Sequence, residues 1–360
     1  MHAQQYYAVG LMSGTSLDGL DIAYSSYTKD GENWSFELLK SKSVSYSEVL
    51  ESDLRNSVKM SALELTELHS EYGRFLAEQV RIFIEEEKIV ELDVIGSHGH
   101  TVFHNPDKGY TLQIGDALWI HKIIEKTVVA DFRVQDVVLG GQGAPLVPVG
   151  DKSLFSEYDY RVNLGGFANI SFEKEGREIA FDICPVNTIL NKFANRLGLD
   201  YDDKGSISKS GKIIPEMLKK LDGIDFYKME YPKSLGVEWN EEMIFPIIDF
   251  YEKESIEDLL STFTHHIANQ ISETLIGKDK TVLLSGGGVY NDFLISLIKE
   301  RTSHKLVIAD QKITDFKEAI IFGFLAILRI RNEVNCLAEV TGAEKDHSTG
   351  IIYNFNTAEK

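Results

Sequence analysis

The chain of 360 residues has only two cysteines, Cys184 and Cys336, and it lacks any long uninterrupted apolar run. Two thiols are too few for the disulfide framework that stabilises small secreted domains. No apolar run reaches the roughly 18 residues that a membrane-spanning helix requires. The first ten residues do not combine a basic start with an apolar stretch, so they do not predict a signal peptide. We therefore expect a cytoplasmic protein without a membrane partner.

Basic residues are scarce relative to acidic ones. The sequence has 37 Lys and Arg against 56 Asp and Glu, which leaves a formal net charge of −19. Because such a surface repels phosphate backbones, the composition argues against nucleic acid as the main partner. A small anionic ligand is not excluded, since backbone amides and a metal ion can bind it locally. With 43% apolar residues, the chain can bury a large core, and its length predicts two domains.

Strands and helices alternate along the sequence. Short apolar runs at 6–12 and 20–24 flank a turn rich in Gly and Asp, which predicts a β-hairpin. Similar runs predict strands at 93–96, 127–130, 161–164, 179–181 and 281–284. Amphipathic stretches predict helices at 62–90, 185–197, 256–276, 291–300 and 315–331. We expect an α/β fold with domains at 1–131 and 132–344, a cleft between them, and a tail (345–360) that returns to the first domain.

Glycines and small polar residues gather at the ends of predicted strands. They occupy four segments: 13–21 (SGTSLDGLD), 140–145, 164–169 and 285–291. Phosphate binding needs convergent backbone N–H groups that larger side chains would block. One such loop is more often only a tight turn. Four of them favour a ligand site, because α/β sheets bind ligands beyond the carboxyl ends of their strands.

Two common nucleotide-binding patterns are absent. The sequence has no GxxxxGK[ST] loop, and no GxGxxG opens a helix after the first strand. A hairpin that carries one phosphate loop, followed by a glycine loop in the second half, instead resembles the actin, hexokinase and Hsp70 superfamily. That resemblance implies two ribonuclease H-like domains.

A closer resemblance runs through nearly the whole chain. Residues 14–21 (GTSLDGLD) are similar to the GTSxDGxD signature of the anhydro-N-acetylmuramic acid kinases. Further similar segments follow in the family's order: 96–102, 111–116, 131–133, 141–148, 163–170, 181–182, 285–291 and 317–319. The resemblance implies an ATP-dependent enzyme of cell-wall recycling. Such an enzyme opens the 1,6-anhydro ring of the amino sugar with water and phosphorylates O6 to give N-acetylmuramic acid 6-phosphate.

The resemblance also implies site residues. Asp182 would be the carboxylate base that activates water against the anomeric carbon. The alternative is that Asp182 caps a helix that begins near Pro185. Mg²⁺ would be held by Asp18 and Asp21, since it prefers carboxylate oxygen. The residues implied for ATP are Gly14, Thr15, Ser16, Leu17, Asp18, Gly19, Leu20, Asp21, Asn163, Gly165, Gly166, Asn169, Gly286, Gly287, Gly288 and Asn291.

Five residues are implied for the sugar: His98, Gln113, Asp131, Arg133 and Glu318. Arg133 follows a predicted strand and could bind the lactyl carboxylate of muramic acid in bidentate fashion. The alternative for Arg133 is a structural ion pair with Asp131 or Asp136. Glu318 would bind sugar hydroxyls, or it is an acid at the start of the last long helix that interacts with the helix dipole.

The chain departs from the family pattern beside the expected base. Where the family has Asp-Thr-Gly-Pro-Gly-Asn, residues 182–187 read Asp-Ile-Cys-Pro-Val-Asn. If the two glycines let a ligand approach the backbone, Cys184 and Val186 would narrow that space. Cys184 itself has no visible catalytic partner and is interpreted as a packing residue. His100 stands where the family has Gln; with His98 and His104 it indicates zinc only weakly, since no cysteine accompanies them.

The sequence is compatible with three functions. The first is the anhydro-sugar kinase. The second is a kinase of another sugar or small hydroxyl compound, which a substrate panel would distinguish. The third is a catalytically silent ATP-binding sensor, which the altered segment after Asp182 motivates. A homodimer is compatible with the family, but the sequence does not identify a dimer surface.

Overall fold

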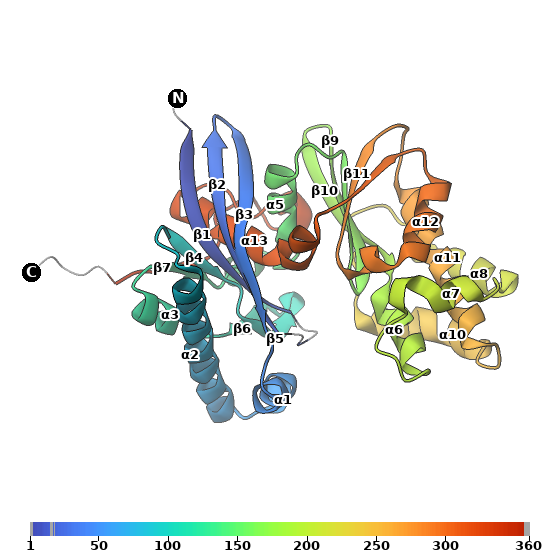
Figure 1. Ribbon diagram of the computed structural model, residues 1–360, viewed down its shortest axis with the longest axis horizontal. Coiled ribbons are helices and arrows are strands. Elements are labelled where there is room, and N and C mark those ends of the chain that lie inside the picture. Colours follow the sequence, from blue (N-terminus) through green and yellow to red (C-terminus); the bar gives the residue numbers. More distant parts are fainter. Residues whose placement is uncertain (1–2, 15–16, 18, 356–360) are drawn as a thin grey trace, which may run out of the picture. The chain divides into compact units, whose positions relative to one another are not determined.

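The computed structural model describes residues 3–14, 17 and 19–355. The chain forms two compact units, both of mixed helix and strand (Figure 1). The first unit contains the residues up to Leu154 and those from Phe316 onward, and the second contains Phe155–Asp315. The predicted boundaries at 131/132 and 344/345 therefore differ from the observed ones. The reason is packing: Gly150 lies directly against Ile321, so the helices that contain them belong to one unit.

The first unit is built on a six-stranded sheet with the order β13-β7-β4-β1-β2-β3. Its strands are β1 (Gln4–Ser13), β2 (Leu20–Asp30), β3 (Asn33–Val44), β4 (Val94–Ser97), β7 (Thr127–Ala130) and β13 (Ile351–Tyr353). Strands β1, β2 and β3 form an antiparallel meander, whereas β4 and β7 run parallel to β1. The tail returns to this sheet, because β13 pairs antiparallel with β7.

Helices cover both faces of this sheet. Val9 and Leu11 pack with α2 in one buried cluster, whereas Gly10 points to the opposite face, towards α13. A Cβ added at Gly10 would lie 1.7 Å from the carbonyl oxygen of Ala319, so only glycine permits this approach. The helices of this unit are α1 (Glu48–Asn56), α2 (Ala62–Glu87), α3 (Ala117–Ile124), α4 (Val134–Val138), α5 (Val147–Leu154), α13 (Gln311–Ile330, from Phe316) and α14 (Ala338–Thr341). A two-stranded ribbon is also present, β5 (His100–Asn105) and β6 (Tyr110–Ile114).

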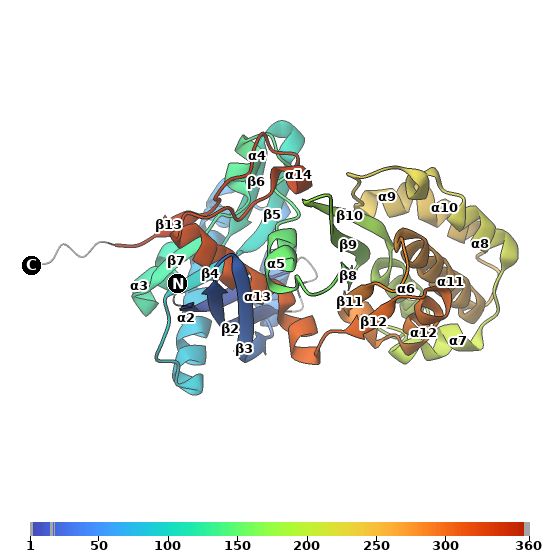
Figure 2. The same ribbon diagram turned by 90° about the horizontal axis from the view of Figure 1, so that it is seen from above.

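The second unit has a five-stranded sheet with the order β10-β9-β8-β11-β12. Its strands are β8 (Tyr160–Leu164), β9 (Phe167–Lys174), β10 (Arg177–Pro185), β11 (Thr281–Ser285) and β12 (Lys305–Ile308). Its helices are α6 (Asn187–Asn195), α7 (Ser206–Ser210), α8 (Pro215–Asp222), α9 (Val237–Trp239), α10 (Phe245–Phe250), α11 (Ile256–Thr274) and α12 (Asp292–Arg301). Figure 2 shows α6, α11 and α12 gathered on one face of the strands, where their apolar residues form the core of the unit.

The two sheets share one topology. In each, the first three strands form an antiparallel meander, and two later strands run parallel to the first strand of that meander. This duplicated arrangement is the actin- and hexokinase-like, ribonuclease H-like architecture that the sequence predicted. It brings the glycine-rich turns to the ends of the first strands, β1 and β8, and of β11.

Two helix boundaries differ from the prediction in ways that affect the site. Pro185 is the last residue of β10 rather than part of a helix, and α6 begins at Asn187. Helix α13 begins at Gln311 because the Oδ1 atom of Asp310 accepts the N–H of Lys312 (2.9 Å). Glu318 therefore lies in the third turn of α13, too far from its start for the helix-dipole interpretation to hold.

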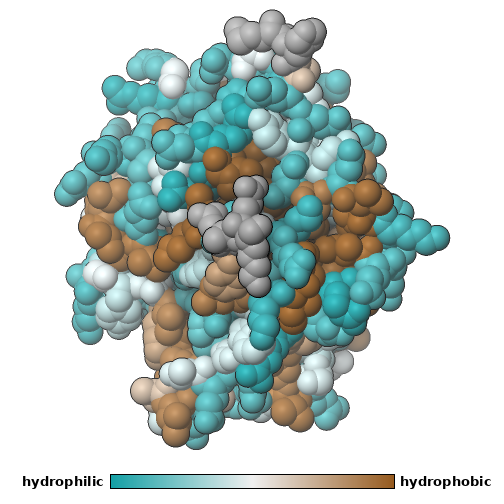
Figure 3. Space-filling view, turned by 90° about the vertical axis from the view of Figure 1, so that its left-hand side faces the viewer, coloured by the Kyte–Doolittle hydropathy of each residue, from teal (hydrophilic) through white to brown (hydrophobic). Residues whose placement is uncertain are grey.

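The surface of the first unit is mixed in character. Figure 3 shows apolar side chains in separate patches that polar side chains interrupt. Within the described part of the chain, no helix is both long and apolar enough to cross a membrane.

Candidate functional site

Asp182 lies inside β10, at an irregularity of the sheet. It pairs with Asn169 of β9, and the register shifts between Asp182 and Cys184. The Asp182 N–H donates to the carbonyl oxygen of Lys233 (3.1 Å), and the Asp182 Oδ2 atom accepts the N–H of Leu235 (2.8 Å). The segment 233–235 thus holds both the backbone and the carboxylate of Asp182. The helix-cap interpretation is wrong, because the cap residue of α6 is Val186.

The carboxylate of Asp182 is half-buried, and its second oxygen is available. Among the described residues, Oδ1 has no hydrogen-bond partner. Burial raises the pKa of Asp182 above its ordinary value, while the N–H of Leu235 opposes this rise. A carboxylate with a raised pKa is a better proton acceptor, as long as it remains ionised at the working pH. Asp182 therefore has the geometry and the electrostatics of a general base.

The residues that replace the two family glycines, Cys184 and Val186, are buried together with their neighbour Ile183. Ile183, Cys184 and Val186 are at most 2% exposed, and all three belong to the hydrophobic core of the second unit. Their side chains fill that core, and a narrowing of the space beside Asp182 stays a prediction. Burial raises the pKa of the Cys184 thiol, which fits its interpretation as a packing residue.

Gly165 and Gly166 form the turn at the end of β8. The first N–H groups of α6 donate to carbonyl oxygens of this turn: Val186 to Gly166 (2.8 Å), Asn187 to Gly165 (3.2 Å) and Thr188 to Gly166 (3.2 Å). These helix amides are used inside the protein and are not free to bind an anion. Gly166 itself is exposed, so an anionic ligand at this turn would approach Gly166 rather than the start of α6.

The three glycines after β11 divide into two that pack and one that is open. Gly286 has a φ of +81°, and an added Cβ would lie 2.5 Å from Asn163 Oδ1. A Cβ on Gly288 would lie 2.7 Å from the Cβ of Leu164. Gly287 is exposed, and a Cβ there would find its nearest neighbour at 3.7 Å, the Nδ2 atom of Asn187. Gly287 is thus the residue of this loop that leaves room for a ligand.

The three asparagines predicted to bind ATP differ in their burial and in their hydrogen bonds. Asn291 is buried, and its Oδ1 atom accepts the N–H of Leu294 (2.9 Å) as the cap of α12. That role uses the Oδ1 atom of Asn291. Asn163 and Asn169 pair with each other across β8 and β9, and Asn169 is exposed. Contact with ATP stays a prediction for all three.

The first-unit loop between β1 and β2 is described only in part. Three of its predicted ligand residues lie outside the described residues: Thr15, Ser16 and Asp18. Leu17 and Leu20 are buried in the core of the first unit, so their side chains anchor the loop and do not face a ligand. Gly14 accepts the N–H of Leu17 (3.4 Å). Gly19 has a φ of +144°, and an added Cβ would lie 2.5 Å from the carbonyl oxygen of Val44.

Asp21 stands at the start of β2, close to Glu318. The Ser43 hydroxyl donates to Asp21 Oδ1 (2.5 Å). The negative charge of Asp21 is among the causes that raise the pKa of Glu318. Carboxylate oxygen suits a hard cation such as Mg²⁺, so the donor chemistry of Asp21 fits the predicted metal.

His98 and Arg133 form the centre of a polar cluster in the first unit. Arg133 donates from Nε to His98 Nε2 (2.9 Å) and from Nη1 to the carbonyl oxygen of Gly143 (2.7 Å). Among the described residues, Nη2 of Arg133 has no hydrogen-bond partner. The structural ion pair of Arg133 with Asp131 or Asp136 is wrong, since its bonds go to a neutral ring and a carbonyl. The guanidinium is thus oriented with its far end available for an anion.

Glu318 adds an acid to this cluster. Its side chain is exposed, yet the surrounding protein desolvates it and raises its pKa, and the charges of Arg133 and Lys317 oppose that rise. Lys317 is itself paired with Asp151 (Nζ to Oδ1, 2.7 Å) in a buried ion pair of α13 and α5. This pair could not be predicted from the sequence, because nothing near Asp151 indicates that it pairs with a lysine on α13.

The last two residues implied for the sugar, Gln113 and Asp131, have different surroundings. Gln113 is buried in β6 beside the His98–Gly99 turn, and its Nε2 atom donates to the hydroxyls of Thr101 (3.3 Å) and Thr111 (2.8 Å). The Oε1 atom of Gln113 has no hydrogen-bond partner in the described part of the chain. The Asp131 side chain bonds to the C-terminal strand, because its Oδ2 atom accepts a hydrogen bond from the hydroxyl of Tyr353 (2.7 Å). Asp131 therefore supports β13, and its contact with the sugar stays a prediction.

His100, the residue that replaces a family Gln, lies next to the first loop. Its Nδ1 atom contacts the hydroxyl of Ser13 (3.1 Å), which also accepts the hydroxyl of Tyr46 (2.7 Å). Burial lowers the pKa of His100 to about 4, so its ring is neutral at physiological pH. His104 bonds instead to Thr111 (3.0 Å), so the three neighbouring histidines have three different partners.

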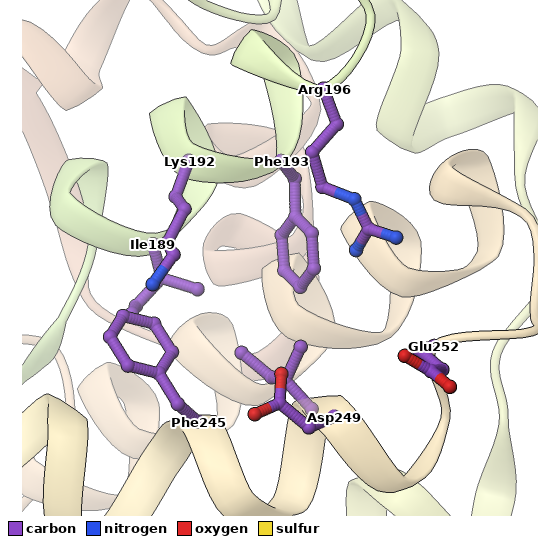
Figure 4. A pocket seen from close by; sticks show the side chains of 8 residues that line it. Ile189, Lys192, Phe193, Arg196, Phe245, Asp249 and Glu252 are labelled. Carbon is purple, nitrogen blue, oxygen red and sulfur yellow. The ribbon is translucent and has the colours of Figure 1, made fainter.

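A pocket of about 240 Å³ opens between α6 and α10 in the second unit (Figure 4). Its polar wall comprises Lys192, Arg196, Asp249 and Glu252, and Lys192 lies over the ring of Phe245. Among the predicted site residues that the structure describes, none lines this pocket.

Comparisons with known proteins agree with the motifs. The family model described as "Anhydro-N-acetylmuramic acid kinase" matches residues 5–355. A relative of that name from Bacillus cereus (strain Q1) is 33% identical over 382 aligned residues, covering 96% of this chain and 98% of the relative. Another from Aliivibrio fischeri is 33% identical, covering 97% and 99%.

Similarity to solved structures is slight. The activator of the 2-hydroxyisocaproyl-CoA dehydratase from Clostridium difficile with bound ADPNP is 14% identical, with a TM-score of 0.42, covering 90% of this chain and 96% of that one. At this TM-score and identity, we draw no conclusion about this chain from that structure. The family model and the relatives each extend over nearly the full chain, and therefore the chain belongs to the anhydro-N-acetylmuramic acid kinase family.

Proposed function

We propose that this chain is an ATP-dependent kinase that opens the 1,6-anhydro ring of anhydro-N-acetylmuramic acid and phosphorylates O6 of the sugar. Membership of the family supports this substrate. The observation that carries the chemistry is the half-buried carboxylate of Asp182, which is held through Oδ2 by the N–H of Leu235 and has Oδ1 available. The product would be N-acetylmuramic acid 6-phosphate, a product suited to the recycling of cell-wall sugar.

The proposed reaction needs one carboxylate. Asp182 Oδ1 accepts a proton from a water molecule, and the water oxygen forms a bond to C1 of the sugar as the C1–O6 bond breaks. The electron pair left on O6 attacks the γ-phosphorus of ATP, and the bond to the bridging oxygen of ADP breaks. Because the departing oxygen is also the phosphoryl acceptor, a second carboxylic acid to protonate it is not required.

The polar cluster of the first unit would bind the sugar. The far end of the Arg133 guanidinium is available for the lactyl carboxylate, and His98 and Gly143 fix its orientation. Glu318 and the unpartnered Oε1 of Gln113 would accept hydrogen bonds from sugar hydroxyls or the acetamido N–H. The residues implied for the sugar belong to the first unit, and Asp182 belongs to the second.

ATP would be bound by the glycine-rich turns. Gly287 and Gly166 are both exposed, and Gly287 leaves room for a ligand next to the backbone. Mg²⁺, when bound, would neutralise charge on the phosphates. Asp21 is the described residue whose oxygen chemistry fits it, with Asp18 as its predicted partner.

A coupled ADP-release assay tests the proposal. Turnover is expected with anhydro-N-acetylmuramic acid and not with intact N-acetylmuramic acid, and oxygen from labelled water should appear at C1 of the product. Asp182→Asn should abolish turnover while the protein remains folded. The matched control is Asp225→Asn in the same unit, because the Asp225 side chain is 98% exposed and pairs only loosely with Lys228.

Each competing function predicts a different result in the same assay. Turnover of intact sugars but not of the anhydro sugar would show an ordinary sugar kinase. Tight ATP binding without turnover of any amino sugar would show a sensor. Product without labelled oxygen at C1 would contradict the role of Asp182 as the base that activates water.

A further inference from the structure

Three potential metal ligands converge in the first unit, apart from the polar cluster of Arg133. Asp136 comes from α4, and Cys336 and His347 face each other in an isolated antiparallel bridge of the C-terminal segment. The Cys336 Sγ atom lies 3.1 Å from Asp136 Oδ1, and His347 Nε2 lies 3.6 Å from the same oxygen. The three ligand atoms all lie within 4.8 Å of one another.

The three side chains are buried, and one ring nitrogen of His347 has no hydrogen-bond partner among the described residues. Asp136, Cys336 and His347 are 0%, 1% and 7% exposed. His347 Nδ1 hydrogen-bonds to the carbonyl oxygen of Lys345 (3.0 Å). A carbonyl only accepts, so Nδ1 carries a proton, and the other ring nitrogen, Nε2, lies on the side of Asp136 and Cys336. Within the described part of the chain, that buried Nε2 has no hydrogen-bond partner.

We propose that Asp136, Cys336 and His347 bind a zinc ion through Oδ1, Sγ and Nε2. Metal-ligating histidines commonly donate their other ring N–H to a backbone carbonyl, as His347 does to Lys345. Zinc bonds of 2.0–2.3 Å in a tetrahedron place neighbouring ligand atoms about 3.3–3.8 Å apart. The observed separations of 3.1 and 3.6 Å lie close to that range. A mixed sulfur, nitrogen and oxygen donor set also favours zinc over Mg²⁺, and water would complete the tetrahedron.

The surroundings of Asp136 are arranged to hold its carboxylate in place. Oδ2 accepts the N–H of Gly143 (2.6 Å), and Oδ1 accepts the hydroxyl of Thr341 (2.7 Å). A Cβ on Gly141 would lie 2.2 Å from Oδ2, so glycine is needed where the loop passes the carboxylate. Such outer contacts fix the orientation of a ligand before the metal binds.

The ion would join the C-terminal segment to the loop that orients Arg133. The N–H of Gly143 donates to Asp136, while the carbonyl oxygen of Gly143 accepts Nη1 of Arg133. The same loop also bonds directly to the C-terminal segment, since the Gln142 N–H donates to the carbonyl oxygen of Thr341 (2.8 Å). A metal at Asp136 would therefore stabilise the position of Gly143 and, through it, of Arg133. This role is structural, since none of the three ligands belongs to the proposed sugar or ATP site.

Metal binding by the full-length protein tests the proposal without an activity assay. The chain is stripped with a chelator, dialysed and titrated with Zn²⁺, and with Co²⁺ as a spectroscopic probe of thiolate ligation. One ion per chain is expected, with a thiolate-to-cobalt charge-transfer band in the near ultraviolet. Zn²⁺ should also raise the melting temperature, because it binds the folded state. Cys336→Ser should abolish the band, and His347→Gln should weaken binding at least tenfold.

The second cysteine provides the matched control. Cys184 is as deeply buried as Cys336 but lies in the other unit, so Cys184→Ser should keep the band and the stoichiometry. A folded wild-type protein that binds no stoichiometric Zn²⁺ and shows no charge-transfer band would overturn the proposal. A band that disappears with Cys184 rather than Cys336 would overturn it equally.

Discussion

Arg133 donates its Nε–H to Nε2 of His98 across 2.9 Å, and the other ring nitrogen of His98 bonds to the carbonyl oxygen of Gly99. A ring that accepts at Nε2 and donates at Nδ1 is neutral. Burial, together with the positive charge of Arg133, lowers the pKa of His98 well below its ordinary value. The ring therefore remains a neutral acceptor throughout the physiological range and holds the guanidinium in one orientation.

Arg133→Lys should weaken binding of the anhydro sugar more than it slows turnover. Lysine lacks the planar fork that can bond to His98, Gly143 and a carboxylate at once. A lost charged hydrogen bond costs about 1.5–3 kcal/mol, which corresponds to a rise in KM of roughly 10- to 100-fold. Steady-state kinetics measure KM and kcat separately. Arg55→Lys on the surface of α1, where the side chain is 60% exposed, is the control, and an unchanged KM in Arg133→Lys would contradict the assigned role.

The rate should fall at acidic pH because Asp182 must be ionised to accept a proton. Burial raises the pKa of Asp182 above its ordinary value, so kcat/KM should be constant above that pKa and decrease as the pH falls through it. This decrease, the acid limb of the pH profile, should occur at a higher pH than the titration of an exposed aspartate. A pH profile of kcat/KM measures it.

Glu318 must be separated from Asp182 in that profile. The pKa of Glu318 is also raised, first by desolvation, so its protonation could produce an acid limb of its own. If Asp182 is responsible, Glu318→Gln should lower the rate but keep the limb at the same pH. A limb that disappears in Glu318→Gln would assign the titration to Glu318 instead.

Much of the fold could be predicted because its signals are local. The short apolar runs at 6–12 and 20–24 became β1 and β2, and the amphipathic stretch at 62–90 became α2. Competing local signals caused the errors at the ends of elements. Asp310 and Asp315 are both plausible helix caps by residue type, and only the bond from Lys312 N–H identifies Asp310 as the one used.

The support of the site could not be predicted, because it depends on contacts between distant residues. Asp182 is held by Leu235, 53 positions away, and nothing in the local pattern around Leu235 indicates that pairing. Cys336 contacts Asp136 from 200 positions away. The family motifs supplied the residue types of the site. They did not indicate that Ile183, Cys184 and Val186 point into the core.

The hydrogen bond from Leu235 N–H should set the position and the pKa of Asp182. Leu235→Pro removes this donor, whereas Leu235→Ala keeps the N–H and shortens only the side chain. Losing a bond to the charged form raises a carboxylate pKa, so the decrease of kcat/KM at acidic pH should occur at a higher pH in Leu235→Pro than in Leu235→Ala. Turnover should also decrease by roughly tenfold, because the carboxylate is less well oriented. Equal profiles for both variants would show that the N–H does not act on Asp182.

Gly286 and Gly287 should respond in opposite ways to the same substitution. Alanine at Gly286 would place Cβ 2.5 Å from Asn163 Oδ1 at a φ of +81°, so Gly286→Ala should lower the melting temperature and reduce all activity. Alanine at Gly287 meets no atom within 3.7 Å, so the fold should be unaffected. If ATP approaches this loop, the added methyl group of Gly287→Ala should raise KM for ATP several-fold and leave KM for the sugar unchanged. Thermal melting and two-substrate kinetics measure both effects, and a Gly287→Ala protein with wild-type KM for ATP would place the nucleotide elsewhere.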